Sequence, residues 1–226
     1  MPADEDTPRP AAEYATDRYG PVFLLLVTAL GFTTFVNESQ LSRAIASLVL
    51  VAAIVGTFRA TGVTPLQLRL TLLGAVGLAI AVIAGEASNQ TGVEVFVTLF
   101  VAGALGFAGT ALLRRIFEQP TIRVREVLAA LSAYLEFTMV FAFAYMAAAR
   151  ATDEAFFANG IEGQMSEFAY FSVVTITTLG YGDLTPATDI GRSLAMIETL
   201  FGQIFLVVLV AFLVGRLGQG RPPDSG

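Results

Sequence analysis

TITTLGYGD, residues 175–183, is a short polar and glycine-rich stretch that lies between two strongly apolar segments. Gly180 and Gly182 can adopt backbone angles that are closed to other residues. When such residues alternate with ordinary ones, successive carbonyl oxygens of an extended segment can point the same way. Carbonyl oxygens directed at a common axis form a binding site for a partly dehydrated cation. The stretch therefore predicts a cation-binding loop.

The composition is that of a membrane protein, because 55% of the 226 residues are hydrophobic and only 14% are charged. The chain has no cysteine, which excludes disulfides and thiolate metal sites, and no histidine, the commonest general base. All 13 basic residues are arginines, against 19 acidic residues, which disfavours a nucleic-acid partner. We expect a protein without a cofactor that is not an enzyme, and the lysine-free composition suggests a prokaryotic source.

Six apolar stretches are long enough for the roughly 17–25 residues that a transmembrane helix needs. They cover residues 19–36, 41–58, 65–84, 92–113, 127–149 and 190–215. A short helix is predicted at 166–177, with Ser166 as its cap and Glu167 near the positive end of its dipole. This segment is too short and too polar to span, so it predicts a re-entrant loop. Residues 1–18 are predicted to be a disordered tail without a signal-peptide pattern.

The arginines predict the orientation of these spans, because cytoplasmic loops carry an excess of basic residues. Ten of the 13 arginines fall on the side that holds both termini, and the other three are Arg43, Arg150 and Arg192. We therefore expect a multi-pass protein of the cell membrane with both termini in the cytoplasm. The loop at 175–183 then opens to the outside.

The stretch at 175–183 resembles the potassium channel signature, TxxTxGYG followed by Asp. Thr175 and Thr178 supply the two threonines, residues 180–182 supply Gly-Tyr-Gly, and Leu179 stands where many family members carry Val. Residues 125–217 as a whole resemble the two-helix pore domain of these channels. The resemblance implies an all-α membrane protein with six transmembrane helices, a re-entrant pore helix and a selectivity filter. Because one chain carries one filter strand, it also implies a homotetramer around the ion path.

The resemblance also implies the residues of the ion path. Potassium would be bound by the carbonyls of Thr178, Leu179, Gly180 and Tyr181, with the hydroxyl of Thr178. The filter would be supported by Thr175, Thr177, Gly182, Asp183, Tyr170 and Phe171, with the Tyr181 ring packed on the pore helix. Some relatives place a Glu behind the filter, but Val174 holds that position here.

The last apolar segment is expected to line the inner pore and to carry gating residues, and the predicted residues are Gly202, Glu198, Leu206 and Val210. For Gly202 a gating hinge and close helix packing both remain open. Glu198 and Glu136 are acids within predicted spans, which are costly and usually functional. A structural role between neighbouring helices is preferred for both, although Glu198 facing water is an alternative.

Residues 19–117 form a predicted four-helix region that lacks the signature of a voltage sensor. Such a sensor needs several basic residues inside its fourth segment, and residues 92–113 contain none. Weak or absent voltage dependence is therefore expected. Glycines at short spacing, Gly74 and Gly77 and then Gly103, Gly106 and Gly109, predict close helix packing.

Together these features predict a potassium-selective channel that passes ions passively through a homotetrameric pore surrounded by membrane lipid. Two alternatives remain open. One is a less selective monovalent cation channel, and the other is the ion-translocating subunit of a potassium transporter.

Overall fold

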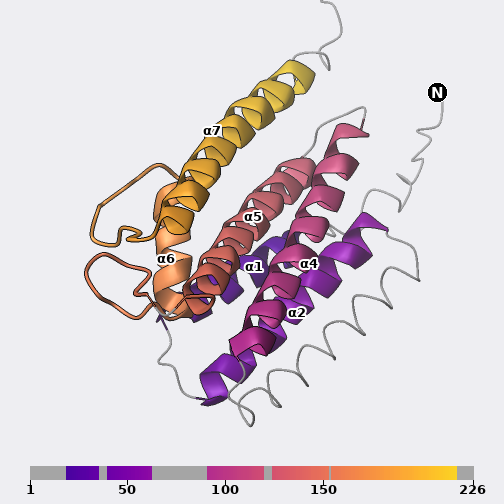
Figure 1. Ribbon diagram of the computed structural model, residues 1–226. Coiled ribbons are helices and arrows are strands. Elements are labelled where there is room, and N and C mark those ends of the chain that lie inside the picture. Colours follow the sequence, from indigo (N-terminus) through magenta and orange to yellow (C-terminus); the bar gives the residue numbers. More distant parts are fainter. Residues whose placement is uncertain (1–18, 36–39, 63–90, 120–123, 153, 218–226) are drawn as a thin grey trace, which may run out of the picture.

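The computed structural model describes residues 19–35, 40–62, 91–119, 124–152 and 154–217, and these ranges are helical apart from loops and one isolated bridge (Figure 1). The helices of this described part are α1 (Gly20–Phe35), α2 (Gln40–Thr61), α4 (Thr91–Phe117), α5 (Val124–Arg150), α6 (Met165–Ile176) and α7 (Asp189–Leu217). The predicted all-α class is confirmed for these residues. The predicted tail 1–18 and the predicted span 65–84 lie outside them.

Three of the described helices are long and apolar enough to cross a membrane. They contain Glu94–Phe117 of α4, Val124–Arg150 of α5 and Asp189–Gly215 of α7. The predicted spans near 19–36 and 41–58 correspond to α1 and α2, whose apolar parts, Gly20–Thr33 and Ile45–Thr61, are shorter. α1 has 16 residues, or about 24 Å of helix, which is less than the roughly 30 Å of a bilayer core. Length and composition therefore support three of the six predicted spans.

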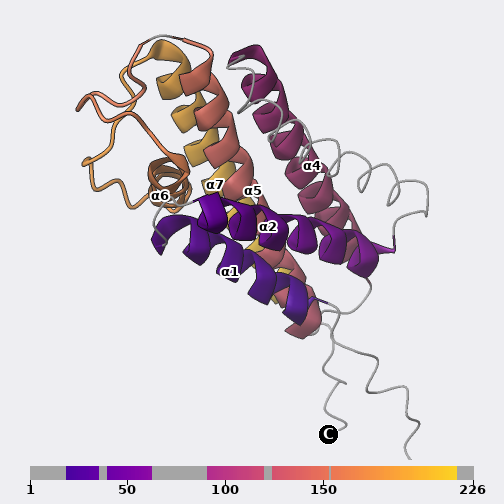
Figure 2. The same cartoon turned by 90° about the horizontal axis from the view of Figure 1, so that it is seen from below.

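α5 is the central helix of the bundle, and it packs against α1, α4, α6 and α7. Its longest contact is with α4, which runs beside it (Figures 1 and 2). Close approach at this contact depends on Gly109, because a β-carbon there would lie 3.1 Å from the Phe137 ring. Gly103 instead faces open space. The predicted packing role of these glycines therefore holds at Gly109 and not at Gly103.

The N-terminal pair of helices is joined to the centre of the bundle by a buried polar contact. α1 and α2 lie side by side in Figure 2, and α2 also packs on α4. The hydroxyl of Thr57 in α2 donates a 2.5 Å hydrogen bond to Oε1 of Glu136 in α5, and both side chains are fully buried. A hydrogen-bonded partner lowers the cost of burying such an acid. Glu136 therefore ties α2 to α5.

The short helix α6 begins slightly before the predicted position. Gln164 is its N-cap, and the carboxylate of Glu167 accepts a 2.9 Å hydrogen bond from the Gln164 backbone N–H. Ser166 lies inside the first turn, where its hydroxyl donates to Glu167. The expected Ser166 cap is therefore wrong, because a capping box of Gln164 and Glu167 caps the start of the helix two residues earlier. α6 has 12 residues, about 18 Å, so it cannot cross a bilayer.

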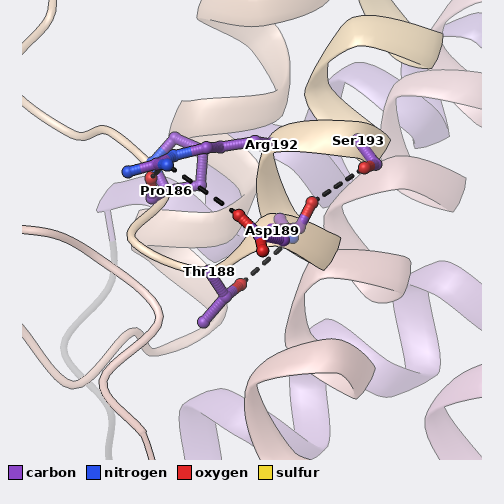
Figure 3. A network of polar contacts seen from close by, with 6 residues as sticks. Pro186, Thr188, Asp189, Arg192 and Ser193 are labelled. Atoms are coloured by element: carbon purple, nitrogen blue, oxygen red, sulfur yellow. Dashed lines mark hydrogen bonds and ion pairs between the residues drawn. The ribbon is translucent and has the colours of Figure 1, made fainter.

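α7 begins in a network of polar contacts that joins it to the preceding loop (Figure 3). The Thr188 hydroxyl accepts a 3.1 Å hydrogen bond from the backbone N–H of Gly191, which caps the first turn. Arg192 donates to the Pro186 carbonyl at 3.3 Å and lies 3.9 Å from the Asp189 carboxylate. The loop that follows residues 175–183 is thus held at the entrance of α7.

Candidate functional site

The stretch that follows α6 alternates between left-handed and ordinary backbone conformations. Thr178, Gly180 and Gly182 have φ angles of +59°, +57° and +80°, in the left-handed region. Leu179 and Tyr181 between them do not. Thr178 is β-branched, so its left-handed backbone is a true outlier that costs on the order of 1–3 kcal/mol. Such strain persists only where the surrounding structure imposes it, and it is concentrated at functional sites.

Hydrogen bonds from the end of α6 impose this conformation. The backbone N–H of Thr178 donates to the Thr175 carbonyl at 2.9 Å. The backbone N–H groups of Leu179 and Gly180 both donate to the Val174 carbonyl, at 2.9 and 3.3 Å. From the other side, the amide of Gln203 in α7 donates to the Thr178 hydroxyl at 3.3 Å. The inner end of the stretch is therefore fixed between α6 and α7.

The outer end of the stretch is fixed by Asp183. The Tyr170 hydroxyl of α6 donates a 2.8 Å hydrogen bond to the Asp183 carboxylate, and Asn159 donates to its backbone carbonyl at 3.2 Å. The bond from Tyr170 holds the pKa of the Asp183 carboxyl below its ordinary value of 3.8. The sequence placed both Tyr170 and Asp183 among the supporting residues, and the structure brings them into contact.

We expect Tyr170→Phe to raise the pKa of Asp183, because the main group that lowers it is removed. In the wild type the hydrogen bond to the carboxylate is present above the lowered pKa and is lost as pH falls through it. In the variant the carboxylate is neutralised at a higher pH. Acid titration of the carboxyl groups, followed by infrared spectroscopy, should therefore show Asp183 protonating at a higher pH in Tyr170→Phe than in the wild type. In an Asp183→Asn background, Tyr170→Phe should leave the acid titration unchanged. Equal titration curves for the wild type and Tyr170→Phe would contradict the role given to Tyr170.

Behind α6 lies a buried polar group centred on Glu198 of α7. The Tyr145 hydroxyl of α5 donates a 2.5 Å hydrogen bond to Glu198 Oε2, and the Ser172 hydroxyl of α6 contacts Oε1. All three residues have an exposed fraction of 0%. The structure thus places Glu198 between three helices and away from the exposed side of α7.

The last carbonyl of α6 is supported from two directions. The Tyr134 hydroxyl of α5 donates to the Ile176 carbonyl at 3.0 Å, which satisfies one of the open acceptors at a helix end. α7 reaches the same carbonyl at Gly202, where a β-carbon would lie only 2.3 Å from the Ile176 oxygen. Gly202 therefore allows α7 to approach the end of α6 closely.

An aromatic cluster packs the outer half of α6. Phe171 lies edge-on to the Tyr145 ring at a centroid distance of 4.9 Å. Phe156 and Phe157, in the loop before α6, pack against Phe168 at 5.2 and 5.3 Å. That loop also pairs with the segment after the stretch, through an isolated bridge between Phe157 and Pro186. Phe171, predicted as a support residue, is buried here.

The remaining predicted residues lie on the exposed side of the single chain. Leu179 and Tyr181 expose 54% and 67% of their surfaces. The Tyr181 side chain was expected to pack on α6, and in the single chain it is largely uncovered. On α7, Leu206 and Val210 are exposed at 37% and 54%. They follow the exposed Gln203 by three and seven residues, and such spacing places side chains on one helix face.

Sequence reasoning missed five polar residues that hold this site, and they are Tyr134, Tyr145, Asn159, Ser172 and Gln203. A usable signal was present for α5, where Tyr134, Thr138 and Tyr145 recur at spacings of four and seven. Such spacing puts polar groups on one face of an otherwise apolar helix. Ser172 and Asn159 carried no comparable signal, because their partners are distant in the sequence.

A protein family described as "Ion channel" matches residues 131–219, which run from the third turn of α5 through the end of α7. This part of the chain is therefore a membrane ion channel domain. Similar proteins include the probable potassium channel protein 2 of Methanocaldococcus jannaschii, which is 40% identical over 52 residues. The inward rectifier potassium channel Kirbac3.1 of Paramagnetospirillum magnetotacticum is 31% identical over 93 residues. Both of these similar proteins are potassium channels by name.

The matches cover 23% and 41% of this chain, and 15% and 29% of those two relatives. The chain thus spans less than a third of the length of each. No solved structure matches significantly. The family resemblance of residues 175–183 is confirmed, and so is the expectation that the chain is not an enzyme, since the matched family consists of channels.

Proposed function

We propose that the protein is a potassium-selective channel that conducts passively through a homotetrameric pore. The observation that carries this proposal is the backbone of residues 178–182, where left-handed residues alternate with ordinary ones. In such a strand successive carbonyl oxygens can face one side. The carbonyls of Thr178, Leu179, Gly180 and Tyr181 would then replace the water around a potassium ion.

Several copies of the chain are needed to complete this site. Residues 177–183 are exposed in the single chain, and irregular backbone is tolerated within a membrane only when protein buries it or when it lines a water-filled path. One strand also supplies only one side of a carbonyl ring. Four copies around a common axis meet both requirements, and the uncovered Tyr181 ring would pack on protein in that assembly.

The inner half of the pore would be lined by α7. Gln203 contacts Thr178 at the inner end of the stretch, so its face of α7 is directed towards the ion path. Leu206 and Val210 continue that face and form an apolar wall. The C-terminal end of each α6 carries partial negative charge, which favours a cation in the cavity below. With six spans and the arginine bias, both termini would lie in the cytoplasm.

Reversal potentials test this function directly. Purified protein is placed in a planar bilayer with potassium on one side and sodium on the other. We expect the current to reverse close to the potassium equilibrium potential. A reversal potential near zero would support the less selective channel, and the absence of channel current would leave the transporter subunit as the better account.

We expect the open probability to change little with membrane potential. The only charged residues in α4 are Glu94, Arg114 and Arg115. Glu94 lies 3.5 Å from Arg150 at the end of α5, and Arg114 pairs with Glu118, so neither arrangement leaves a movable row of charges. Patch recordings over a wide voltage range measure this. A steep sigmoidal activation curve, which requires several gating charges, would contradict the prediction.

A further inference from the structure

The buried group around Glu198 contains more acceptors than its hydroxyl protons can serve. Ser172 Oγ lies 2.7 Å from the Thr138 carbonyl oxygen and also contacts Glu198 Oε1. A serine hydroxyl carries one proton and can donate only one strong hydrogen bond. The Thr138 carbonyl has no proton to donate, so its contact requires the proton of Ser172. The contact between Ser172 and Glu198 then needs a proton from elsewhere.

Within the part of the chain that the structure describes, only Glu198 itself can supply this proton. The Tyr145 hydroxyl is already committed to Glu198 Oε2. Among the described residues no cation forms an ion pair with Glu198, and Arg125, Arg150 and Arg192 pair with other acids. A charged carboxylate without such a partner is very costly in a fully buried position. Hydrogen bonding and burial therefore both indicate that Glu198 is protonated and neutral.

We propose that Glu198 is a neutral carboxylic acid that positions the pore helix α6. Its protonated oxygen donates to Ser172, Ser172 donates to the Thr138 carbonyl, and Tyr145 donates to the other oxygen of Glu198. This chain of hydrogen bonds connects α7, α6 and α5 one turn before the end of α6, just behind residues 178–182. Glu198 acts through Ser172 and does not itself touch the ion path.

The Tyr145 end of the chain is held in place by packing. Its ring is fully buried and lies edge-on to both Phe171 and Phe156, at 4.9 and 5.7 Å. The hydroxyl is therefore presented to Glu198 in a fixed direction. A group held in this way gives α6 a defined position relative to α7, as a filter of fixed dimensions requires.

Glutamine distinguishes a neutral acid from a charged one at this position. Its amide nitrogen donates as the protonated oxygen does, and its carbonyl accepts as the other oxygen does. We expect Glu198→Gln to retain potassium conductance and selectivity within about twofold of the wild type, whereas Glu198→Ala and Ser172→Ala lose roughly tenfold or more. If Glu198→Gln is as defective as Glu198→Ala, while both variants assemble normally, the proposal that Glu198 is a neutral acid is wrong.

Infrared spectroscopy gives a second test that does not depend on conductance. The difference spectrum between the wild type and Glu198→Gln should contain the carbonyl band of a protonated carboxylic acid, and Ser172→Ala should shift this band. Loss of a carboxylate band instead would overturn the proposal. The electrical test rests on the proposed potassium conduction, and wild-type current separates the two: a silent wild type contradicts the channel, whereas a conducting wild type with a silent Glu198→Gln contradicts only this inference.

Discussion

Replacing Gly180 by alanine is expected to abolish potassium flux. Gly180 has a φ angle of +57°, where an alanine side chain costs about 1–2 kcal/mol. The backbone N–H of Gly180 makes one long hydrogen bond, 3.3 Å to the Val174 carbonyl, so the substituted residue can escape the strain by rotating its peptide group. Rotation takes a carbonyl away from the proposed ion path and removes a ligand from all four copies at once.

The control for this prediction is Gly160→Ala, in the loop before α6. Gly160 has a φ angle of +75°, and a β-carbon there meets open space, as it does at Gly180. The two substitutions therefore impose similar backbone strain, but only one lies in the stretch 178–182. Flux into liposomes should be lost in Gly180→Ala and kept in Gly160→Ala. Equal flux in both variants would show that the stretch is not the ion path.

The second large effect is expected at Gly202. A β-carbon there would lie 2.3 Å from the Ile176 carbonyl oxygen and 2.9 Å from the Ile176 side chain. The obstacle at the shorter distance is backbone, so a change of side-chain rotamer cannot relieve it. Gly202→Ala must push α7 away from the end of α6, and we expect it to cost on the order of 1–3 kcal/mol of stability. It should also break the nearby contact of Gln203 with Thr178.

Thermal unfolding in detergent and potassium flux together measure this effect. Gly103→Ala in α4 is the matched control, because it is also a helical glycine and a β-carbon there meets open space. The control should unfold at the wild-type temperature or slightly above it, since alanine favours helix over glycine. Normal stability and flux in Gly202→Ala would contradict the packing role. Normal stability with altered gating would favour the hinge.

The backbone of residues 178–182 was largely predictable because its determinants are local. Gly180 and Gly182 indicate left-handed backbone at two alternating positions, and the structure has this conformation at both. Thr178 also adopts the left-handed conformation, although a threonine does not favour it. Its conformation is imposed by the end of α6 and by Gln203, and such long-range constraint is invisible in the stretch itself.

The buried contacts behind residues 178–182 were harder to predict. The acids at 136 and 198 were recognisable as unusual in apolar helices, but their partners depend on how the helices are arranged. Glu136 meets Thr57, which is 79 residues away in the sequence, and Glu198 meets Tyr145, which is 53 residues away. Spacing along one helix predicts which residues share a face, but it does not predict which other helix packs against that face.

The most direct test of the account is potassium efflux from liposomes that contain the purified full chain. Potassium-loaded liposomes are diluted into sodium solution with a protonophore, so that protons enter only as potassium leaves, and a dye reports the acidification. We predict rapid acidification that barium blocks and that Gly180→Ala abolishes. Acidification no faster than in empty liposomes, from protein that is folded and assembled, would contradict the proposed potassium channel.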